Sequence, residues 1–224
     1  MKYFLRDWNC SGGFRNNHGE KWSCLVGPKY LLMAKELRYI EPFYGWLELY
    51  SHDRDAHSPF YAVDHNLFQF DRSINRIPAH PLWDDFGSES LLVKILYANY
   101  TQGVAILELF GEWNDLYDND FKLLSENCLS PLLEHGIRKF ILICENVFHG
   151  YFESDDYYEA MQEQIEDGWL CAIRLRPGLQ EEMMEYGIDR YFFWSPILDE
   201  LLWRKLKPIR LFHEVSKRLE NLIG

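Results

Sequence analysis

Residues 91–97 read LLVKILY and residues 104–110 read VAILELF, two short runs of branched and aromatic residues that are typical of β-strands. The connector between them, residues 99–103, ends in Gly103, and a glycine in a short connector favours a hairpin loop. These runs therefore predict a β-hairpin, and the order of the elements around it indicates the fold class.

A helix, a strand, a second helix and a second strand follow the hairpin. Asn114 or Asp115 can cap the first helix. Its core-facing stripe has helical spacing, at Phe121, Leu124, Cys128 and Leu132. Pro131 predicts a kink or a restart in this helix, and Gly136 predicts its left-handed end.

The runs FILIC (140–144) and WLCAI (169–173) are apolar throughout, which favours strands buried on both faces. The second helix lies between them and begins near residues 154–156. Strands that alternate with helices imply right-handed crossovers and an at least partly parallel sheet.

The remaining segments are assigned outward from this region. On the C-terminal side we expect a helix over 179–186, a short strand over 191–194, and helices over 197–206 and 209–222. On the N-terminal side we expect strands at 3–5, 22–26, 46–50 and 67–70. The sequence thus predicts an α/β (α+β) chain with a mixed sheet. Residues 91–224 form an α/β domain that ends in helices. Residues 1–90 form a β-rich region that lies beside the sheet or shares it. One domain and two domains both stay open.

Composition excludes several classes of protein. The chain has 224 residues, of which 47% are hydrophobic and 17% aromatic, so it is not a disordered polypeptide. Its formal net charge of -12 argues against a nucleic-acid binder and against binding to an anionic membrane surface, because both need a positive field. No apolar run approaches the ~20 residues of a membrane span.

The start of the chain lacks the apolar region of a secretory signal, and the five cysteines have no paired spacing. We therefore expect reduced thiols and a cytoplasmic location.

A histidine-rich stretch is the best candidate for a site. Four of the eight histidines lie between residues 52 and 80, and histidine with carboxylate is what a Zn or Fe site requires. The candidate metal ligands are His52, Asp55, His57 and His65. Residues five apart share neither a strand face nor a helix face, so His52 and His57 converge only across a loop. The alternative, which we prefer, is a polar loop without a cofactor.

Two carboxylates in strand regions are also of interest. Glu108 lies between Leu107 and Leu109; if buried, it would need a partner or a raised pKa, whereas a solvent-facing or edge position is the simpler interpretation. Glu145 and Asn146 follow the run 140–144, at the carboxyl edge where open α/β sheets bind ligands, although a polar loop also explains them.

No catalytic motif names a reaction. The sequence contains neither a phosphate-binding G-x-x-x-x-G-K-[ST] loop nor a G-x-S-x-G nucleophile elbow. The second helix and its flanks instead carry an acidic face, made by Glu153, Asp155, Asp156, Glu159, Glu163, Glu166 and Asp167. If this face mediates contacts, its partner is a protein with a basic surface.

The order of elements from Leu91 to Arg176 resembles STAS domains, the anti-sigma-factor-antagonist fold. In that family a Gly-Glu pair commonly closes the second strand, and Gly111-Glu112 stands in the matching place. The resemblance implies a mostly non-catalytic regulator or binding module, in which many members carry a phosphorylatable serine at the start of the second helix. The matching position is Ser154, which can equally be a helix cap.

Three functions are compatible with these observations. The first is a non-enzymatic cytoplasmic binding or regulatory protein, without a cofactor. The second is a small metal-dependent hydrolase that uses a Zn ion held by the histidine-rich stretch. The third is a small-ligand carrier with an aromatic pocket. The sequence does not indicate an oligomeric state.

Overall fold

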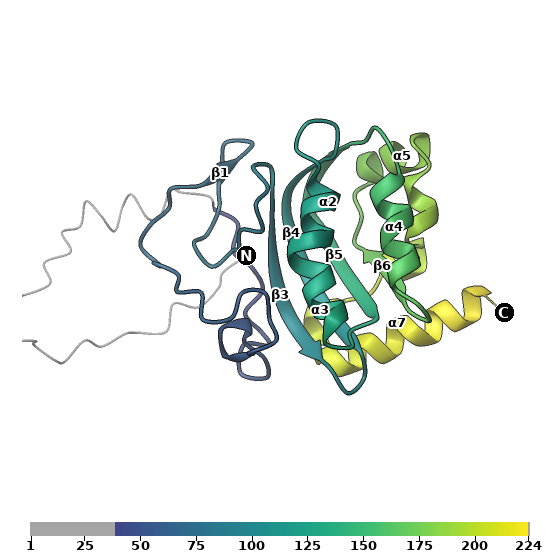
Figure 1. The fold of residues 1–224 in the computed structure, drawn as a ribbon, viewed down its shortest axis with the longest axis horizontal. Helices are drawn as coiled ribbons and strands as arrows, with labels where there is room; N and C mark the ends of the chain where they lie inside the picture. Colours follow the sequence, from purple (N-terminus) through teal and green to yellow (C-terminus); the bar gives the residue numbers. More distant parts are fainter. Residues whose placement is uncertain (1–38, 224) are drawn as a thin grey trace, which may run out of the picture. The chain divides into compact units, whose positions relative to one another are not determined.

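The four apolar runs form the central sheet of the molecule, in a computed structural model that describes residues 39–223 (Figure 1). The strands are β3 (Leu91–Asn99), β4 (Val104–Asn114), β5 (Lys139–Tyr151) and β6 (Trp169–Ile173). They lie side by side in that order. β3 and β4 form the predicted antiparallel hairpin, and β4, β5 and β6 run parallel. The prediction of an α/β chain with a mixed sheet is confirmed.

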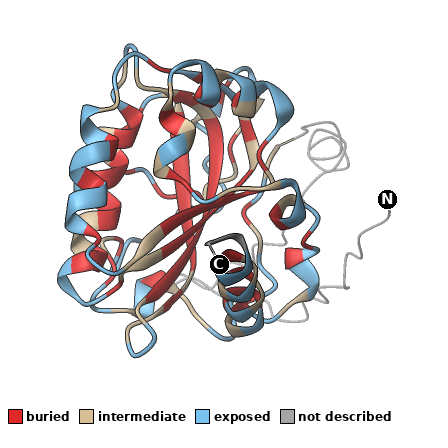
Figure 2. Cartoon of the chain, turned by 90° about the vertical axis from the view of Figure 1, so that its right-hand side faces the viewer, coloured by how far each residue is buried: buried red, intermediate tan, exposed pale blue. Residues whose placement is uncertain are grey.

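Helices from the middle of the chain cover one face of this sheet. They are α2 (Asp120–Leu124), the π-helical segment η2 (Ser125–Leu129), α3 (Ser130–Glu134), α4 (Asp156–Gln164) and α5 (Pro177–Glu185). Their apolar side chains, among them Phe121, Met161 and Leu179, pack in one buried cluster with alternate residues of all four strands. Figure 2 shows the buried strands at the centre and the exposed outer sides of the helices.

The predicted restart at Pro131 is not found, because α2, η2 and α3 follow one another without a break, and the local irregularity is π-helical geometry. The five residues before α3 are π-helical, and Pro131 lies in the first turn of α3, where a missing N–H donor is tolerated. Gly136 follows the helix at φ 91°, the predicted left-handed end.

The predicted start of the first helix is wrong. β4 continues to Asn114, and α2 begins only at Asp120. Asp115 still serves the helix, because its Oδ1 accepts a hydrogen bond of 2.7 Å from the backbone N–H of Phe121. Asp115 therefore lies before the helix in the chain, and its side chain reaches forward to the first turn of the helix.

The C-terminal tail covers the opposite face. The elements on this face are α6 (Pro196–Asp199), η4 (Trp203–Lys205) and α7 (Pro208–Ile223), whereas η3 (Ile188–Tyr191) packs on the first face, where Ile188 joins the cluster of α4 and α5. The predicted helix over 209–222 is confirmed as α7, with Phe212, Val215 and Leu219 buried. A single helix over 197–206 is wrong, because α6 and η4 are separate short elements. The predicted strand at 191–194 is reduced to one bridge between Phe193 and Cys171.

Residues 39–90 pack along β3 as loops with little regular structure. They contain η1 (His52–Arg54) and a two-stranded ribbon of β1 (Ser73–Ile74) and β2 (Ile77–Pro78). The predicted strands at 3–5 and 22–26 lie outside the described residues. Those at 46–50 and 67–70 are wrong: the first is a turn and the second is irregular. The likeness of residues 91–176 to STAS domains and the boundary at residue 90 stay predictions.

The described helices were also compared with what a membrane-spanning helix requires. None of those within residues 39–223 has both the length and the apolar character that a bilayer crossing requires. The longest, α7, carries charged side chains such as Lys217 and Glu220 along its length.

Candidate functional site

Four polar side chains from separate segments meet beside β3. Asp84 lies in the loop before this strand, and its backbone pairs with Val93 in both directions, at 2.8 and 3.1 Å. Lys94 is the next residue of β3. His52 begins η1, and His65 lies in the loop that follows η1. We call His52, His65, Asp84 and Lys94 the Asp84 cluster.

The carboxylate of Asp84 is the centre of this cluster. Its Oδ1 lies 2.8 Å from Nε2 of His65 and 3.3 Å from Nε2 of His52. Its Oδ2 lies 3.1 Å from Nζ of Lys94, which is also 3.4 Å from Nε2 of His52. Asp84 is 1% exposed, His52 5% and Lys94 7%, so these polar groups interact in a site shielded from solvent.

The environment of Asp84 keeps its carboxyl group ionised. Burial raises its pKa, but hydrogen bonds from His52 and His65 and the ammonium of Lys94 outweigh that effect and lower the pKa to about 2. Burial also lowers the pKa of Lys94, and the nearby Asp84 carboxylate opposes this. Asp84 therefore stays ionised, and the neighbouring ammonium of Lys94 balances its charge.

A pocket of about 290 Å³ opens above the cluster. His52, His65 and Lys94 contribute to its floor. Its walls are mainly aromatic and aliphatic, and include Phe43, Tyr44, Trp46, Leu47, Leu67 and Leu96. Apolar walls with a few convergent polar groups are the usual construction of a small-molecule site, and this volume is at the lower end of the range for such sites.

Long-range contacts fix one wall of the pocket. The indole Nε1 of Trp46 donates a 2.9 Å hydrogen bond to the carbonyl oxygen of Leu206, and the ring packs against Trp203 with centroids 5.7 Å apart. The backbone N–H of Phe43 donates to Oε2 of Glu108 at 2.7 Å. The wall is therefore attached both to the C-terminal tail and to the sheet.

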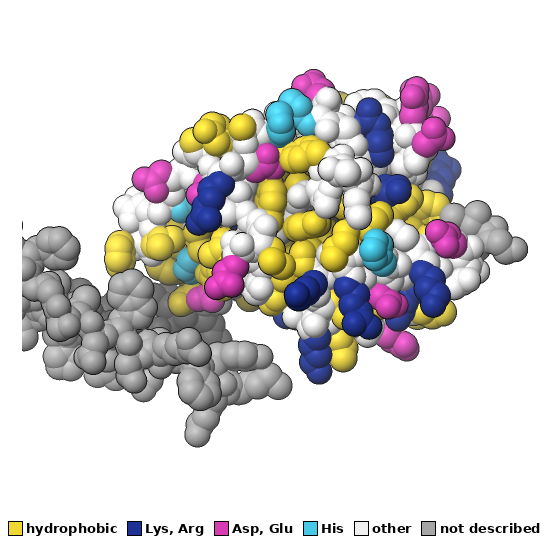
Figure 3. Space-filling model, turned by 90° about the horizontal axis from the view of Figure 1, so that it is seen from below, with side chains coloured by type: hydrophobic (Ala, Val, Ile, Leu, Met, Phe, Trp, Pro, Cys, Tyr) yellow, Lys and Arg dark blue, Asp and Glu magenta, His cyan; other side chains and the backbone are white. Residues whose placement is uncertain are grey.

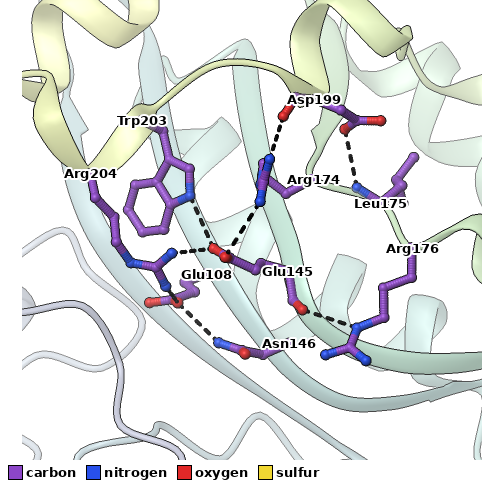
Figure 4. A network of polar contacts seen from close by, with 9 residues as sticks. All are labelled: Glu108, Glu145, Asn146, Arg174, Leu175, Arg176, Asp199, Trp203 and Arg204. Carbon is purple, nitrogen blue, oxygen red and sulfur yellow. Dashed lines mark hydrogen bonds and ion pairs between the residues drawn. The ribbon is translucent and has the colours of Figure 1, made fainter. Parts of the chain in front are cut away.

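Glu108 belongs to a second polar network, on β4, β5 and η4 (Figure 4). The guanidinium of Arg204 lies 3.4 Å from Glu108 and also pairs with Glu145, which Arg174 approaches to 3.7 Å. Nδ2 of Asn146 donates to Glu108 at 3.3 Å. Burial raises the pKa of Glu108 to about 7, although the Phe43 N–H and Arg204 favour the ionised form. The preferred interpretation of Glu108 as a solvent-facing or edge residue is wrong, since its exposed fraction is 0%.

Glu145 and Asn146 do not follow a strand end, contrary to expectation. β5 continues to Tyr151, so both residues lie within the strand. Glu145 nevertheless faces the tail, where Trp203 Nε1 donates to it at 3.3 Å. These contacts join β5 to η4.

Two aspartates on the helical face, half-buried Asp115 and buried Asp120, form a third polar group. The hydroxyl of Tyr158 donates to Asp115, and burial raises the pKa of Asp115 to about 6 despite this hydrogen bond. Asp120 accepts from the hydroxyls of Ser88 and Ser90. These bonds attach α2 and α4 to β4 and to the start of β3.

The chain was compared with protein families and with curated proteins. No protein-family model matches the chain, and no curated protein matches it. What the pocket binds is therefore inferred from its own residues.

The structure brings together two of the four predicted metal ligands, His52 and His65. Asp55 lies apart from them and accepts hydrogen bonds from the hydroxyls of Tyr50 and Tyr100, at 2.8 and 2.6 Å. The ring of His57 also lies apart, with its centroid 4.2 Å from that of His135.

Sequence reasoning missed two members of the Asp84 cluster, Asp84 and Lys94. For Lys94 there was a signal, a single charge within an apolar strand. Asp84 gave none, because it stands in an irregular, turn-rich segment beside the equally acidic Asp85.

The remaining sequence candidates lie around α4. Ser154 is exposed and precedes the helix, which begins at Asp156; its hydroxyl is 3.3 Å from the carboxylate of Asp156. The acidic residues of this helix point to solvent, as Glu159 and Glu163 do, while Asp155 pairs with Arg190. Figure 3 shows the molecule from below, where hydrophobic side chains gather over the middle of the face and most charged side chains lie around them. Phosphorylation of Ser154 and a basic partner both stay predictions.

Proposed function

We propose that this chain is a binding protein whose pocket holds a small, largely apolar molecule with one anionic or hydrogen-bond-accepting group. One observation carries the proposal: aromatic and aliphatic walls enclose a floor that contains Lys94 and two imidazoles. The apolar part of the ligand would be removed from water by the walls, and its acceptor group would meet the floor.

Lys94 is the best group to fix the ligand's orientation. An ammonium group has three N–H donors, and its polar neighbours in the cluster, Asp84 at 3.1 Å and Nε2 of His52 at 3.4 Å, occupy two of them at most. The third donor is available to an acceptor in the pocket. A carboxylate would gain a charge-assisted hydrogen bond there, whereas a purely apolar molecule would leave the donor without a partner.

The proposal can be tested with 2-naphthoate as the probe and 2-naphthamide as its neutral isostere, in isothermal titration calorimetry. For a ligand of this size we expect a dissociation constant of about 100 µM for naphthoate, and roughly tenfold weaker binding of the amide. Absence of heat with naphthoate at millimolar concentration, or equal affinity for the two molecules, would refute the proposal.

A pair of variants assigns the binding to this pocket. Val63 lines the pocket and is 40% exposed, so Val63→Trp places a large side chain at its mouth without disturbing the core. Leu202 is 63% exposed and lies outside the pocket, so Leu202→Trp is the matched control. Val63→Trp should abolish naphthoate binding, and Leu202→Trp should leave it unchanged.

A further inference from the structure

The Asp84 cluster has a second property, the convergence of nitrogen and oxygen atoms that commonly coordinate metals. Nε2 of His52, Nε2 of His65 and a carboxylate oxygen of Asp84 all lie within 4.8 Å of one another. They come from η1, from the loop after it and from the loop before β3, so the fold and not a local sequence motif brings them together.

The hydrogen bonds within the cluster are incomplete. Oδ1 of Asp84 has both imidazole nitrogens as neighbours, whereas Oδ2 accepts no hydrogen bond from any side chain or amide of residues 39–223, although the atom is buried. Nζ of Lys94 approaches Oδ2 at 3.1 Å as an ion pair only. The ammonium of Lys94 thus offsets the charge of this buried carboxylate without completing its hydrogen bonds, and a metal ion coordinated by the carboxylate would take over that role.

We propose that His52, His65 and Asp84 form a binding site for a divalent first-row transition ion, with Zn²⁺ as its probe. Two imidazoles and one carboxylate are a ligand set that zinc and iron accept. Bonds of 2.0–2.1 Å in tetrahedral geometry place ligand atoms about 3.3 Å apart. The His52–Asp84 distance is 3.3 Å, and the His65–Asp84 distance of 2.8 Å requires only a small widening.

The proposed ion would have an open coordination position toward the pocket. His52 and His65 line the pocket, while Asp84 lies beneath it with a side chain that is 0% exposed. A water molecule or an acceptor atom of a small molecule would complete the coordination from the pocket side. The metal site does not depend on the organic ligand proposed above, because all three protein ligands are in place without it.

Lys94 competes with the ion for the same carboxylate. Its ammonium lies 3.1 Å from Asp84 and 3.4 Å from Nε2 of His52, so a metal bound to both residues must displace this positive charge. Replacement of Lys94 by methionine keeps most of the length of the side chain and removes the competing charge. The site therefore predicts that Lys94→Met binds metal more tightly than the wild-type protein, an outcome that a purely structural ion pair would not give.

The test uses the full chain, freed of metal with a chelator and titrated with Zn²⁺ by calorimetry. The wild-type protein should bind about one ion per chain, His65→Ala should lose at least tenfold in affinity, and Lys94→Met should gain roughly tenfold. His57→Ala is the matched control, because His57 lies outside the cluster; its affinity should equal that of the wild type. Far-UV circular dichroism checks that each variant is folded.

Spectra of Co²⁺-loaded protein give a second readout that does not rely on affinity. Coordination by two imidazoles and a carboxylate in a four-coordinate site gives intense visible absorption bands, which Asp84→Asn should weaken and His57→Ala should not. No stoichiometric Zn²⁺ binding by the wild-type protein, unchanged affinity in His65→Ala, or weaker binding in Lys94→Met would each overturn the metal site. None of these results involves naphthoate, so the ligand pocket and the metal site can fail separately.

Discussion

Lys94 on β3 and Glu108 on β4 are direct partners in the antiparallel register, so their side chains lie on the same face of the sheet. Each charge is nevertheless paired with a residue from outside the hairpin. Lys94 lies 3.1 Å from Asp84, and Glu108 lies 3.4 Å from Arg204. A band of polar groups thus crosses a buried sheet and joins the floor of the pocket to the network of the C-terminal tail.

Glu108→Gln should stabilise the protein at high pH. The pKa of Glu108 is raised to about 7 from an ordinary value of 4.5, so the folded state binds this proton more tightly than the unfolded state. The free energy of unfolding therefore falls as pH rises from 4.5 to 7, and above that range the loss caused by ionised Glu108 no longer grows. We expect Glu108→Gln to exceed the wild type by up to about 3 kcal/mol at pH 8 and to match it near pH 4. Urea unfolding across this range measures the difference; exposed Glu126→Gln should leave the pH profile unchanged.

Asp84→Ala should be strongly destabilising in the metal-free protein. It leaves the ammonium of Lys94 buried without its counter-ion, and removal of one partner of a buried pair costs about 3–5 kcal/mol. Asp84→Ala/Lys94→Met removes both charges and should recover most of that loss. A double-mutant cycle from chemical denaturation measures the coupling, and additive losses would contradict the pairing.

Tyr158→Phe should cost about 1–3 kcal/mol, because it removes the only side-chain hydroxyl that donates to half-buried Asp115 among the described residues. Since this hydrogen bond favours the ionised carboxyl, its loss raises the pKa of Asp115 above about 6. The destabilisation should then be larger at pH 8 than at pH 4. Tyr157 neighbours it on α4 and is 40% exposed, so Tyr157→Phe is the control and should have little effect. Thermal unfolding at the two pH values gives both quantities.

Gly111→Ala should be among the most damaging single-methyl changes. Gly111 has φ 136°, and an added Cβ would overlap the carbonyl oxygen of Ser90, so backbone strain and a clash coincide. We expect a loss of more than about 2 kcal/mol in denaturant unfolding. A Cβ added to Gly178 in α5 would meet no atom within 4 Å, and Gly178→Ala should stabilise the helix by up to about 1 kcal/mol. Equal effects of the two changes would contradict this account.

The sheet could be predicted because its signals are local. Runs such as 140–144 and 169–173 are apolar at every position, and the alternation of strands with helices then favours parallel pairing. The failures at 46–50 and 197–206 have one cause in common. Trp46 and Trp203 pack against each other across the molecule, and this contact, which no local pattern reveals, holds both segments in turns and short helices.

The site could be predicted only in part for a similar reason. A high local density of histidine drew attention to His52 and His65, but it could not separate them from His57, which packs against His135 instead. Asp84 and Lys94 meet because the loop before β3 pairs with β3 through the backbone of Val93. That pairing depends on tertiary packing, and no local sequence pattern indicates it.

The attachment of the pocket wall to the tail has a consequence for protein synthesis. Trp46 emerges from the ribosome long before Leu206, yet the indole hydrogen bond joins the two across 160 positions. Until the tail has been translated, Trp46 lacks both its hydrogen-bond acceptor and the ring of Trp203, and this part of the wall faces water or other nascent chains. The cavity is therefore completed last, and a chain interrupted within the tail would have a finished sheet but no finished pocket.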